Sequence, residues 1–221
     1  MERSAASCDY LRDPASIERE SVRRARDATD LSALPAALHP LALRLVQATG
    51  RPEIVAALRW RDGAAAAGRA ALAAGAPILA DSKTVAAGIA RDRLPPGCEA
   101  LCLLDAPGVA GTAVRRKTTR SAAQVDCWSP WLAGAVVAIG NAPTALFALL
   151  EALAAGAPKP ALVLGFPVGF VGAADSKQAL IDAADALDLP YIALAGREGG
   201  DALAAAAVNA LTEALPEEPG S

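Results

Sequence analysis

Histidine is almost absent from this sequence: the 221 residues include a single one, His39. A metal centre built from several histidines is therefore excluded, and a Ser-His-Asp or Cys-His catalytic arrangement would depend on this one residue. His39 directly precedes Pro40, and we expect it to cap or pack locally rather than to take part in catalysis.

Cysteine is also scarce, with four residues in the chain. Four cysteines in a chain of this length do not indicate a disulfide framework. Cys98 and Cys102 would lie apart along an expected strand, and no histidine stands near them to complete a zinc site. We expect reduced, partly buried thiols and no metal centre.

No apolar run reaches the length of a membrane span, because much of the 53% hydrophobic content is alanine. The net charge of −3 gives no support to general nucleic-acid binding. The first 26 residues are charged and polar, unlike a signal peptide or an amphipathic anchor. We expect a cytoplasmic protein with neither a membrane nor a nucleic-acid partner.

The stretch that organises the chain begins with an apolar run, Val136 to Ile139, typical of a strand buried on both faces. Gly140-Asn141 follows and tolerates a tight turn, and Pro143 suits the first turn of a helix. In open α/β sheets the ligand lies outside the carboxyl ends of the strands. The turn at Gly140-Asn141 is therefore the first place to expect a ligand.

Strand and helix patterns alternate along most of the chain. Strands are expected at 77–80, 100–104, 136–139, 161–164 and 191–194. Helices are expected at 14–28, 35–48, 53–58, 64–74, 121–132, 144–153, 175–187 and 201–215, with a short one opened by 81–84. This alternation predicts an α/β fold with a parallel sheet of about five strands and helices on both faces. We expect one domain at 14–215, a lead-in at 1–13 and a flexible tail at 216–221.

Three polar segments allow two interpretations each. The glycine-rich loop 165–172 fits neither the dinucleotide fingerprint nor Walker A; its backbone N–H groups either receive a carboxylate or only form a turn. The basic segment 115–121 is either a solvated helix start or a ligand contact. The charged helix at 14–28 either covers the domain as a solvated helix or binds an anion.

Five blocks of the sequence belong together: 10–14 with Ile17 and Ser21, 75–79, 119–123, 139–146 and 165–177. Together they resemble the precorrin-8X methylmutase (precorrin isomerase) family of cobalamin biosynthesis, and the resemblance extends from about Tyr10 to Leu211. The blocks 139–146 and 165–177 are specific to that family.

The resemblance implies a homodimeric α/β isomerase that moves a methyl group from C11 to C12 of ring C in a corrinoid, without an external cofactor. The substrate is rich in carboxylates, so Arg120 is expected to clamp one of them, since guanidinium pairs with carboxylate in bidentate fashion. The other positions that the resemblance assigns to substrate binding are Ser21, Ser121, Asn141, Gly169, Phe170, Val171 and Gly172.

The family places a proton-donating histidine where this chain has Gln47, and methionine where it has Thr84. A glutamine side chain donates hydrogen bonds but does not titrate near neutral pH. His39 lies two helical turns upstream, roughly 12 Å along the axis, and cannot simply replace it. Two hypotheses follow: the family reaction proceeds with Gln47 as an orienting donor, or the chain is a catalytically silent relative that binds or carries a tetrapyrrole.

Overall fold

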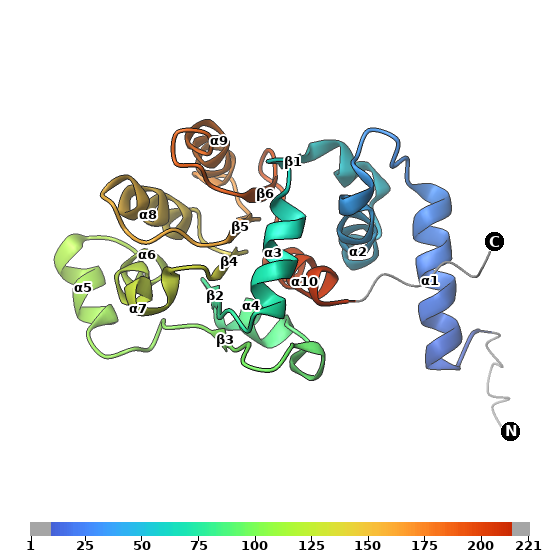
Figure 1. Ribbon diagram of the computed structural model, residues 1–221, viewed down its shortest axis with the longest axis horizontal. Coiled ribbons are helices and arrows are strands. Elements are labelled where there is room, and N and C mark those ends of the chain that lie inside the picture. Colours follow the sequence, from blue (N-terminus) through green and yellow to red (C-terminus); the bar gives the residue numbers. More distant parts are fainter. Residues whose placement is uncertain (1–9, 214–221) are drawn as a thin grey trace, which may run out of the picture.

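The computed structural model describes residues 10–213, which form a six-stranded sheet with helices on both sides (Figure 1). The strand order is β1-β6-β5-β4-β2-β3. Five strands are parallel, and only β1 pairs antiparallel, with β6. The strands are β1 (Leu58–Trp60), β2 (Ile78–Ala80), β3 (Ala100–Leu101), β4 (Val136–Ile139), β5 (Leu162–Gly165) and β6 (Tyr191–Leu194).

The direction in which strands are added to the sheet reverses between β2 and β4. From β2 the chain moves outward to β3, then returns to place β4 on the other side of β2. Such a reversal opens a crevice at the carboxyl ends of the two strands, where open α/β sheets bind their ligands. The four residues of β4 are fully buried, as the unbroken apolar run of a central parallel strand requires.

Alternate strand residues feed two separate cores. Ile78, Val136 and Leu162 contribute to the core on one face of the sheet, and Leu79, Val137 and Val163 to the core on the other. The helices of the first core are α2 (His39–Thr49), α3 (Ala64–Ala73), α4 (Lys83–Gly88) and α10 (Asp201–Thr212). Those of the second are α7 (Ser129–Leu132), α8 (Pro143–Ala154) and α9 (Ala173–Ala183). Helix α6 (Arg120–Ala123) contributes Ala123 to a smaller third cluster with Val109 and Ala113.

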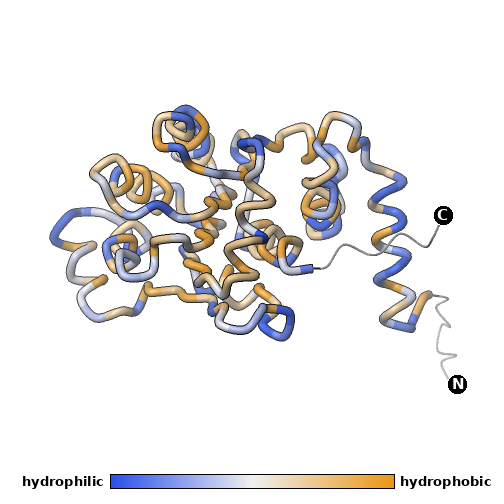
Figure 2. Tube along the Cα trace, in the orientation of Figure 1, coloured by the Kyte–Doolittle hydropathy of each residue, from blue (hydrophilic) through white to orange (hydrophobic). Residues whose placement is uncertain are grey.

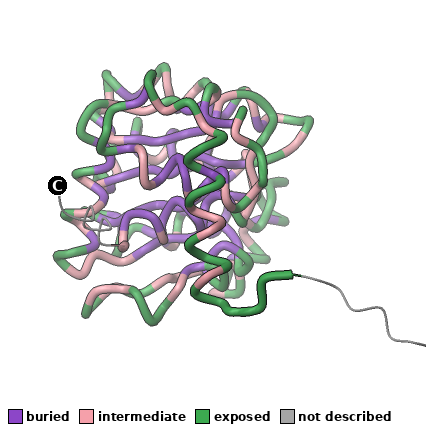
Figure 3. The backbone as a smooth tube through the Cα atoms, turned by 90° about the vertical axis from the view of Figure 1, so that its right-hand side faces the viewer, coloured by how far each residue is buried: buried purple, intermediate pink, exposed green. Residues whose placement is uncertain are grey.

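Helix α1 (Pro14–Ala28) lies outside α2 at one end of the molecule (Figure 1). Most of its residues are exposed (Figure 3) and hydrophilic (Figure 2), and Ala25 is its only buried residue. Asp13 caps its N-terminus by accepting from the Ser16 N–H at 2.8 Å. Within residues 10–213 no helix is both long and apolar enough to cross a membrane.

The α/β fold with a mostly parallel sheet is confirmed, and the expected strands 136–139 and 191–194 have the predicted bounds. Three local predictions were wrong. The sheet has a sixth strand, β1, where a helical segment was expected to end; the short 3-10 helix η2 (Pro52–Ala57) precedes it. An unpredicted helix, α5 (Val109–Arg116), precedes α6. The helix expected at 121–132 is divided into α6, the 3-10 helix η4 (Gln124–Trp128) and α7.

The remaining short elements are η1 (Ala36–Leu38) and η3 (Arg91–Arg93). The strand expected at 100–104 is reduced to the two residues of β3, and its chain continues as a loop. His39 packs locally, as predicted, with Nε2 3.1 Å from the carbonyl oxygen of Leu34. Of the expected terminal segments, 1–9 and 216–221 lie outside the described residues.

Candidate functional site

Asp81 organises the backbone at the reversal point of the sheet. It follows β2, and its buried carboxylate accepts three successive backbone N–H groups beyond β4: from Gly140 at 2.9 Å, Asn141 at 3.0 Å and Ala142 at 2.6 Å. Burial raises the pKa of Asp81 to about 6, because its effect outweighs that of the three N–H donors, which lower the pKa. The carboxylate thereby fixes the turn that presents the exposed Asn141 side chain at the crevice.

Only glycine fits at position 140, because the first turn of α10 packs directly against its backbone. A Cβ at this position would lie 2.8 Å from the Asp201 Cα and 2.9 Å from the Ala204 Cβ. Ser82 strengthens this contact by donating its hydroxyl to Asp201 at 2.6 Å. The first turn of α10 and the two chain segments beyond β2 and β4 thus form one rigid unit.

Arg120 is the first residue of α6, at the same edge of the sheet. Thr119 caps this helix by accepting from the Ala122 N–H at 3.1 Å, and its hydroxyl lies 2.7 Å from that of Thr144 in α8. The Arg120 guanidinium donates to the Leu104 carbonyl at 2.9 Å and pairs with Asp105. The basic segment 115–121 therefore reaches the region of Asn141, with Ser121 half-buried beside Arg120.

The glycine-rich loop beyond β5 is held by the loop beyond β6. Gly169 donates its N–H to the Arg197 carbonyl at 3.1 Å, and Gly200 donates to the Phe166 carbonyl at 2.8 Å. The loops are so close that a Cβ on Gly199 would lie 2.1 Å from the Phe166 carbonyl oxygen. Between these anchors Phe170 is 88% exposed, with the Arg197 guanidinium 5.1 Å from its ring centroid. The tip of the loop thus exposes an apolar side chain to solvent, while backbone hydrogen bonds to the loop beyond β6 hold its ends in place.

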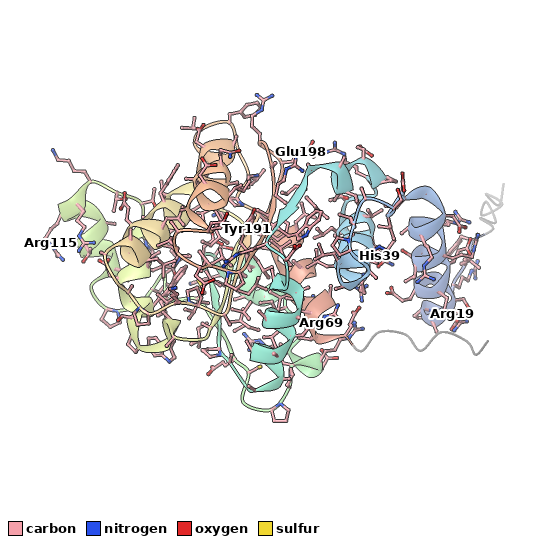
Figure 4. The ribbon with its side chains drawn as sticks, turned by 45° about the horizontal axis from the view of Figure 1, so that its top comes forward. Arg19, His39, Arg69, Arg115, Tyr191 and Glu198 are labelled. Carbon is pink, nitrogen blue, oxygen red and sulfur yellow. The ribbon has the colours of Figure 1, made fainter. Side chains whose placement is uncertain are left out.

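A buried lysine ties the same loops to α9. The side chain of Lys177 is fully buried, and its ammonium donates to the Glu198 carbonyl at 2.5 Å. Burial lowers the pKa of Lys177 to about 8. The Glu198 carboxylate in turn accepts from Arg51, beyond the end of α2, at 2.7 Å. In Figure 4, Glu198 accordingly lies close to η2, while Arg115 on α5 and Arg19 on α1 mark opposite ends of the molecule.

Gln47 and Ser21 lie in contact with each other. The Gln47 amide donates to the Ser21 hydroxyl at 3.1 Å, across the contact between α2 and α1. Both residues line a surface pocket of about 680 Å³ between these helices. Its other lining residues are Leu11, Ile17, Glu20, Arg24, Ala25, Ala28, Val46, Gly50 and Pro52.

The predicted site residues fall into three groups in the described chain. Ser21 and Gln47 share the α1–α2 pocket, whose lining contains none of the others. Arg120, Ser121 and Asn141 lie at the starts of α6 and α8. The segment 169–172 forms the tip of the loop beyond β5. The salt bridge between Arg51 and Glu198 links the end of α2 to this loop region.

Sequence reasoning missed the structural roles of Asp81 and Lys177. Asp81 and Lys83 were interpreted only as the opening of a short helix. A carboxylate directly after a buried strand is a usable signal, but its importance depends on β4 being the neighbour of β2, which the sequence does not state. Lys177 lies in the expected helix 175–187, where a lysine ordinarily faces solvent.

Comparisons with known proteins agree with this architecture. The CbiC family pattern, described as precorrin-8X methylmutase, matches residues 16–214. The chain is 54% identical to the precorrin-8X methylmutase of Pseudomonas aeruginosa over 92% of this chain and 97% of that one. It is 49% identical to that of a Sinorhizobium species over 92% and 96%. A cobalt-precorrin-8 methylmutase of Priestia megaterium is 34% identical over 79% and 76%.

Among solved structures, the precorrin-8X methyl mutase of Thermus thermophilus superposes with a TM-score of 0.81. It is 40% identical in sequence, and the match covers 90% of this chain and 94% of that one. Sequence pattern, relatives and fold therefore agree along nearly the whole chain: it belongs to the precorrin-8X methylmutase family.

Proposed function

We propose that this protein carries out the family reaction, the intramolecular migration of a methyl group from C11 to C12 of ring C that converts precorrin-8X into hydrogenobyrinate. As a member of the family it is a methylmutase, an isomerase of cobalamin biosynthesis. The observation that carries the proposal is the close identity to precorrin-8X methylmutases over nearly their whole length. The reaction is an isomerisation, so it needs neither an oxidant nor a second substrate.

The proposed substrate is the metal-free corrinoid. The relatives named for precorrin-8X are more similar to this chain, over more of its length, than the Priestia relative named for the cobalt compound. The expected result is faster turnover of precorrin-8X than of cobalt-precorrin-8 when each is supplied separately at equal concentration and formation of its own isomerised product, metal-free or cobalt-containing, is followed by visible absorbance. Equal or faster turnover of the cobalt compound would contradict this part of the proposal.

Substrate binding is assigned to the three groups of residues at the carboxyl edge and the α1–α2 pocket. Arg120 clamps a peripheral carboxylate, since a guanidinium offers paired N–H donors. Asn141 offers an exposed amide from a turn that Asp81 holds in place. The exposed Phe170 and Val171, 88% and 89% accessible, offer apolar contact for the macrocycle beside the N–H groups of the loop.

Gln47 has a binding and orienting role in this proposal. One of its two amide N–H donors is used by Ser21, which leaves the other for the substrate. The carboxylate in the same pocket, Glu20, is no substitute acid: hydrogen bonds from Arg23 and Arg24 lower its pKa to about 2, so it stays ionised. The proton that eases migration therefore reaches ring C by a route other than residue 47 or Glu20.

The silent-relative hypothesis remains the second candidate, because Gln47 stands at the position of the family's histidine. Both hypotheses predict corrinoid binding and differ only in turnover. Incubation of precorrin-8X with the natural chain distinguishes them: accumulation of hydrogenobyrinate supports the isomerase, whereas a spectral shift on binding without product supports the carrier.

The same proposal makes the protein a cytoplasmic homodimer. Cys98, Cys102 and Cys127 are free thiols, which suits a reducing compartment. Helix α1 contacts the rest of the chain mainly through α2. Ile17 of this helix and Leu11, just before it, line the pocket that holds Gln47 and are 45% and 53% exposed. A second chain packed over this region would cover those side chains.

A further inference from the structure

Two cations from different elements converge on one carboxylate at the crevice. Lys83, the first residue of α4, and Arg120, the first residue of α6, both form salt bridges with Asp105. Lys83 follows β2 and Asp105 follows β3, so the cluster lies at the carboxyl edge of the sheet, beside the reversal point. The other ion pair of the basic segment 115–121, between Arg116 and Asp126 at 2.6 Å, joins one cation to one carboxylate.

The shared carboxylate contributes little to the stability of the fold. The side chains of Lys83, Asp105 and Arg120 are 68%, 56% and 52% exposed. Ion pairs between side chains this exposed contribute little to stability, because water and salt screen the charges. A ligand that brings its own carboxylate can therefore replace Asp105 at small cost.

Arg120 is held in place independently of Asp105. Its Nη2 also donates to the Leu104 carbonyl at 2.9 Å, and the hydrogen bonds found among residues 10–213 use no other nitrogen of its guanidinium. Nε and Nη1 thus keep donors for a second acceptor. The three charged side chains sum to one positive charge, which favours an incoming anion.

The cluster is also fixed to the backbone that presents Asn141. Lys83 directly follows Asp81 and Ser82 in the chain. Ser82 donates its hydroxyl to Asp201, and Asp81 accepts from the backbone of the turn at Gly140-Asn141. On the other side, Thr119 joins the start of α6 to Thr144 in α8. The two cations and the Asn141 amide are therefore presented by one connected piece of structure.

We propose that Lys83 and Arg120 together bind one peripheral carboxylate of the corrinoid, and that Asp105 is the internal counter-ion which this carboxylate displaces. The inference rests on the proposed function and adds to it Lys83 as a second cation and Asp105 as a competitor. Asp105 keeps the two cations near one another when no ligand is bound and lowers their affinity for other anions.

The test is a visible-absorbance titration with hydrogenobyrinic acid, the family product, on the full-length protein. Lys83→Gln should weaken binding by about 5- to 10-fold, because a charge-assisted contact is lost at an exposed site. Asp105→Asn should tighten binding by about 2- to 5-fold, because the competitor is removed. In an Arg120→Ala background the gain from Asp105→Asn should shrink, since the two residues act on one carboxylate.

Asp126→Asn is the matched control, because it removes the same charge from a similarly exposed salt bridge of the same basic region. It should leave the dissociation constant unchanged, and a corrinoid whose carboxylates are all amides should not distinguish Asp105→Asn from the natural protein. Equal effects of Asp105→Asn and Asp126→Asn, or weaker binding by Asp105→Asn, would overturn the inference while leaving the proposed function intact. No binding by the natural protein would overturn both.

Discussion

At the scale of single residues, Asp81 sets the geometry of the crevice through one buried carboxylate. Its oxygens satisfy three successive N–H donors of the turn beyond β4, at 2.6 to 3.0 Å. Its own carbonyl accepts from the buried Gln124 amide at 2.7 Å, and Gln124 also accepts from the Leu103 N–H at 3.0 Å. These bonds join the segments beyond β2, β3 and β4, so a change at Asp81 should disturb the predicted substrate contacts at the carboxyl edge of the sheet.

The titration of Asp81 should appear in the pH dependence of stability. Its pKa in the folded chain, about 6, exceeds the ordinary value of 3.8, so between these values the folded state binds more protons than the unfolded state. The contribution of Asp81 to the free energy of unfolding is therefore full below about pH 4 and falls as pH rises through 6, by on the order of 1–3 kcal/mol in total. Asp81→Asn removes this dependence.

The measurement is urea denaturation of the natural protein and of Asp81→Asn from pH 4 to pH 8. The difference between their unfolding free energies should decline with rising pH up to about 7 and then level off. A difference that stays constant across this range, or rises, would contradict the assigned direction of the pKa shift.

At the residue scale, the sequence indicated candidates mainly through the family resemblance. It assigned Gln47 and Ser21 to the site; the two lie in contact with each other, and their roles toward a ligand stay predictions. Asp81 was not identified, because its three donors lie in the turn beyond β4, 59 to 61 positions further along the chain. Which strands are neighbours is a property of the whole sheet, and no local pattern reports it.

At the scale of elements, the sequence predicts strands buried on both faces better than short or interrupted elements. The run 136–139 is apolar throughout and was located with its bounds. β1 has three residues, one of them the exposed Arg59, and so lacks the apolar run of the central strands. The helix expected at 121–132 is broken before Pro130, whose ring favours a new first turn.

The contact between the loops beyond β5 and β6 gives an element-scale prediction. Gly199→Ala would place a Cβ 2.1 Å from the Phe166 carbonyl oxygen and 2.6 Å from that of Pro167, so the backbones must separate. The expected cost is about 1–3 kcal/mol of unfolding free energy, together with weaker binding of hydrogenobyrinic acid, because the loop tip at 169–172 moves. Denaturant unfolding and the absorbance titration measure the two effects.

Gly111→Ala is the matched control, since its Cβ would meet only the flexible end of Arg115, at 3.2 Å, in the middle of α5. Alanine should be neutral or slightly stabilising there. If Gly199→Ala behaves like this control in both measurements, the two loops do not depend on each other as described.

At the scale of the whole molecule, the described chain is one layered body with its outermost helix attached along a single side. Helix α1 contacts α2, and the pocket between them, about 680 Å³, holds both Ser21 and Gln47. The remaining predicted site residues lie along the carboxyl edge of the sheet. A homodimer in which a second chain covers the α1–α2 region would enclose the pocket more fully than one chain does.

Light scattering on the purified protein at micromolar concentration tests the assembly. The expected mass is twice the 22.3 kDa of one chain. A mass equal to that of the single chain across the micromolar range would show that the pocket at Gln47 is completed without a partner, and the homodimer would have to be withdrawn.

The central claim is that the natural chain converts precorrin-8X with Gln47 at the position of the family's histidine. The decisive measurement is the single-turnover rate of hydrogenobyrinate formation by the natural protein, Gln47→Ala and Gln47→His. We predict turnover by the natural protein and a lower rate for Gln47→Ala, because the hydrogen bond that orients the substrate is lost. Gln47→His should raise the rate, by up to about 10²- to 10⁴-fold, the range that general acid catalysis supplies. Binding without any turnover by the natural protein, together with turnover by Gln47→His, would contradict the claim and identify the chain as a silent relative.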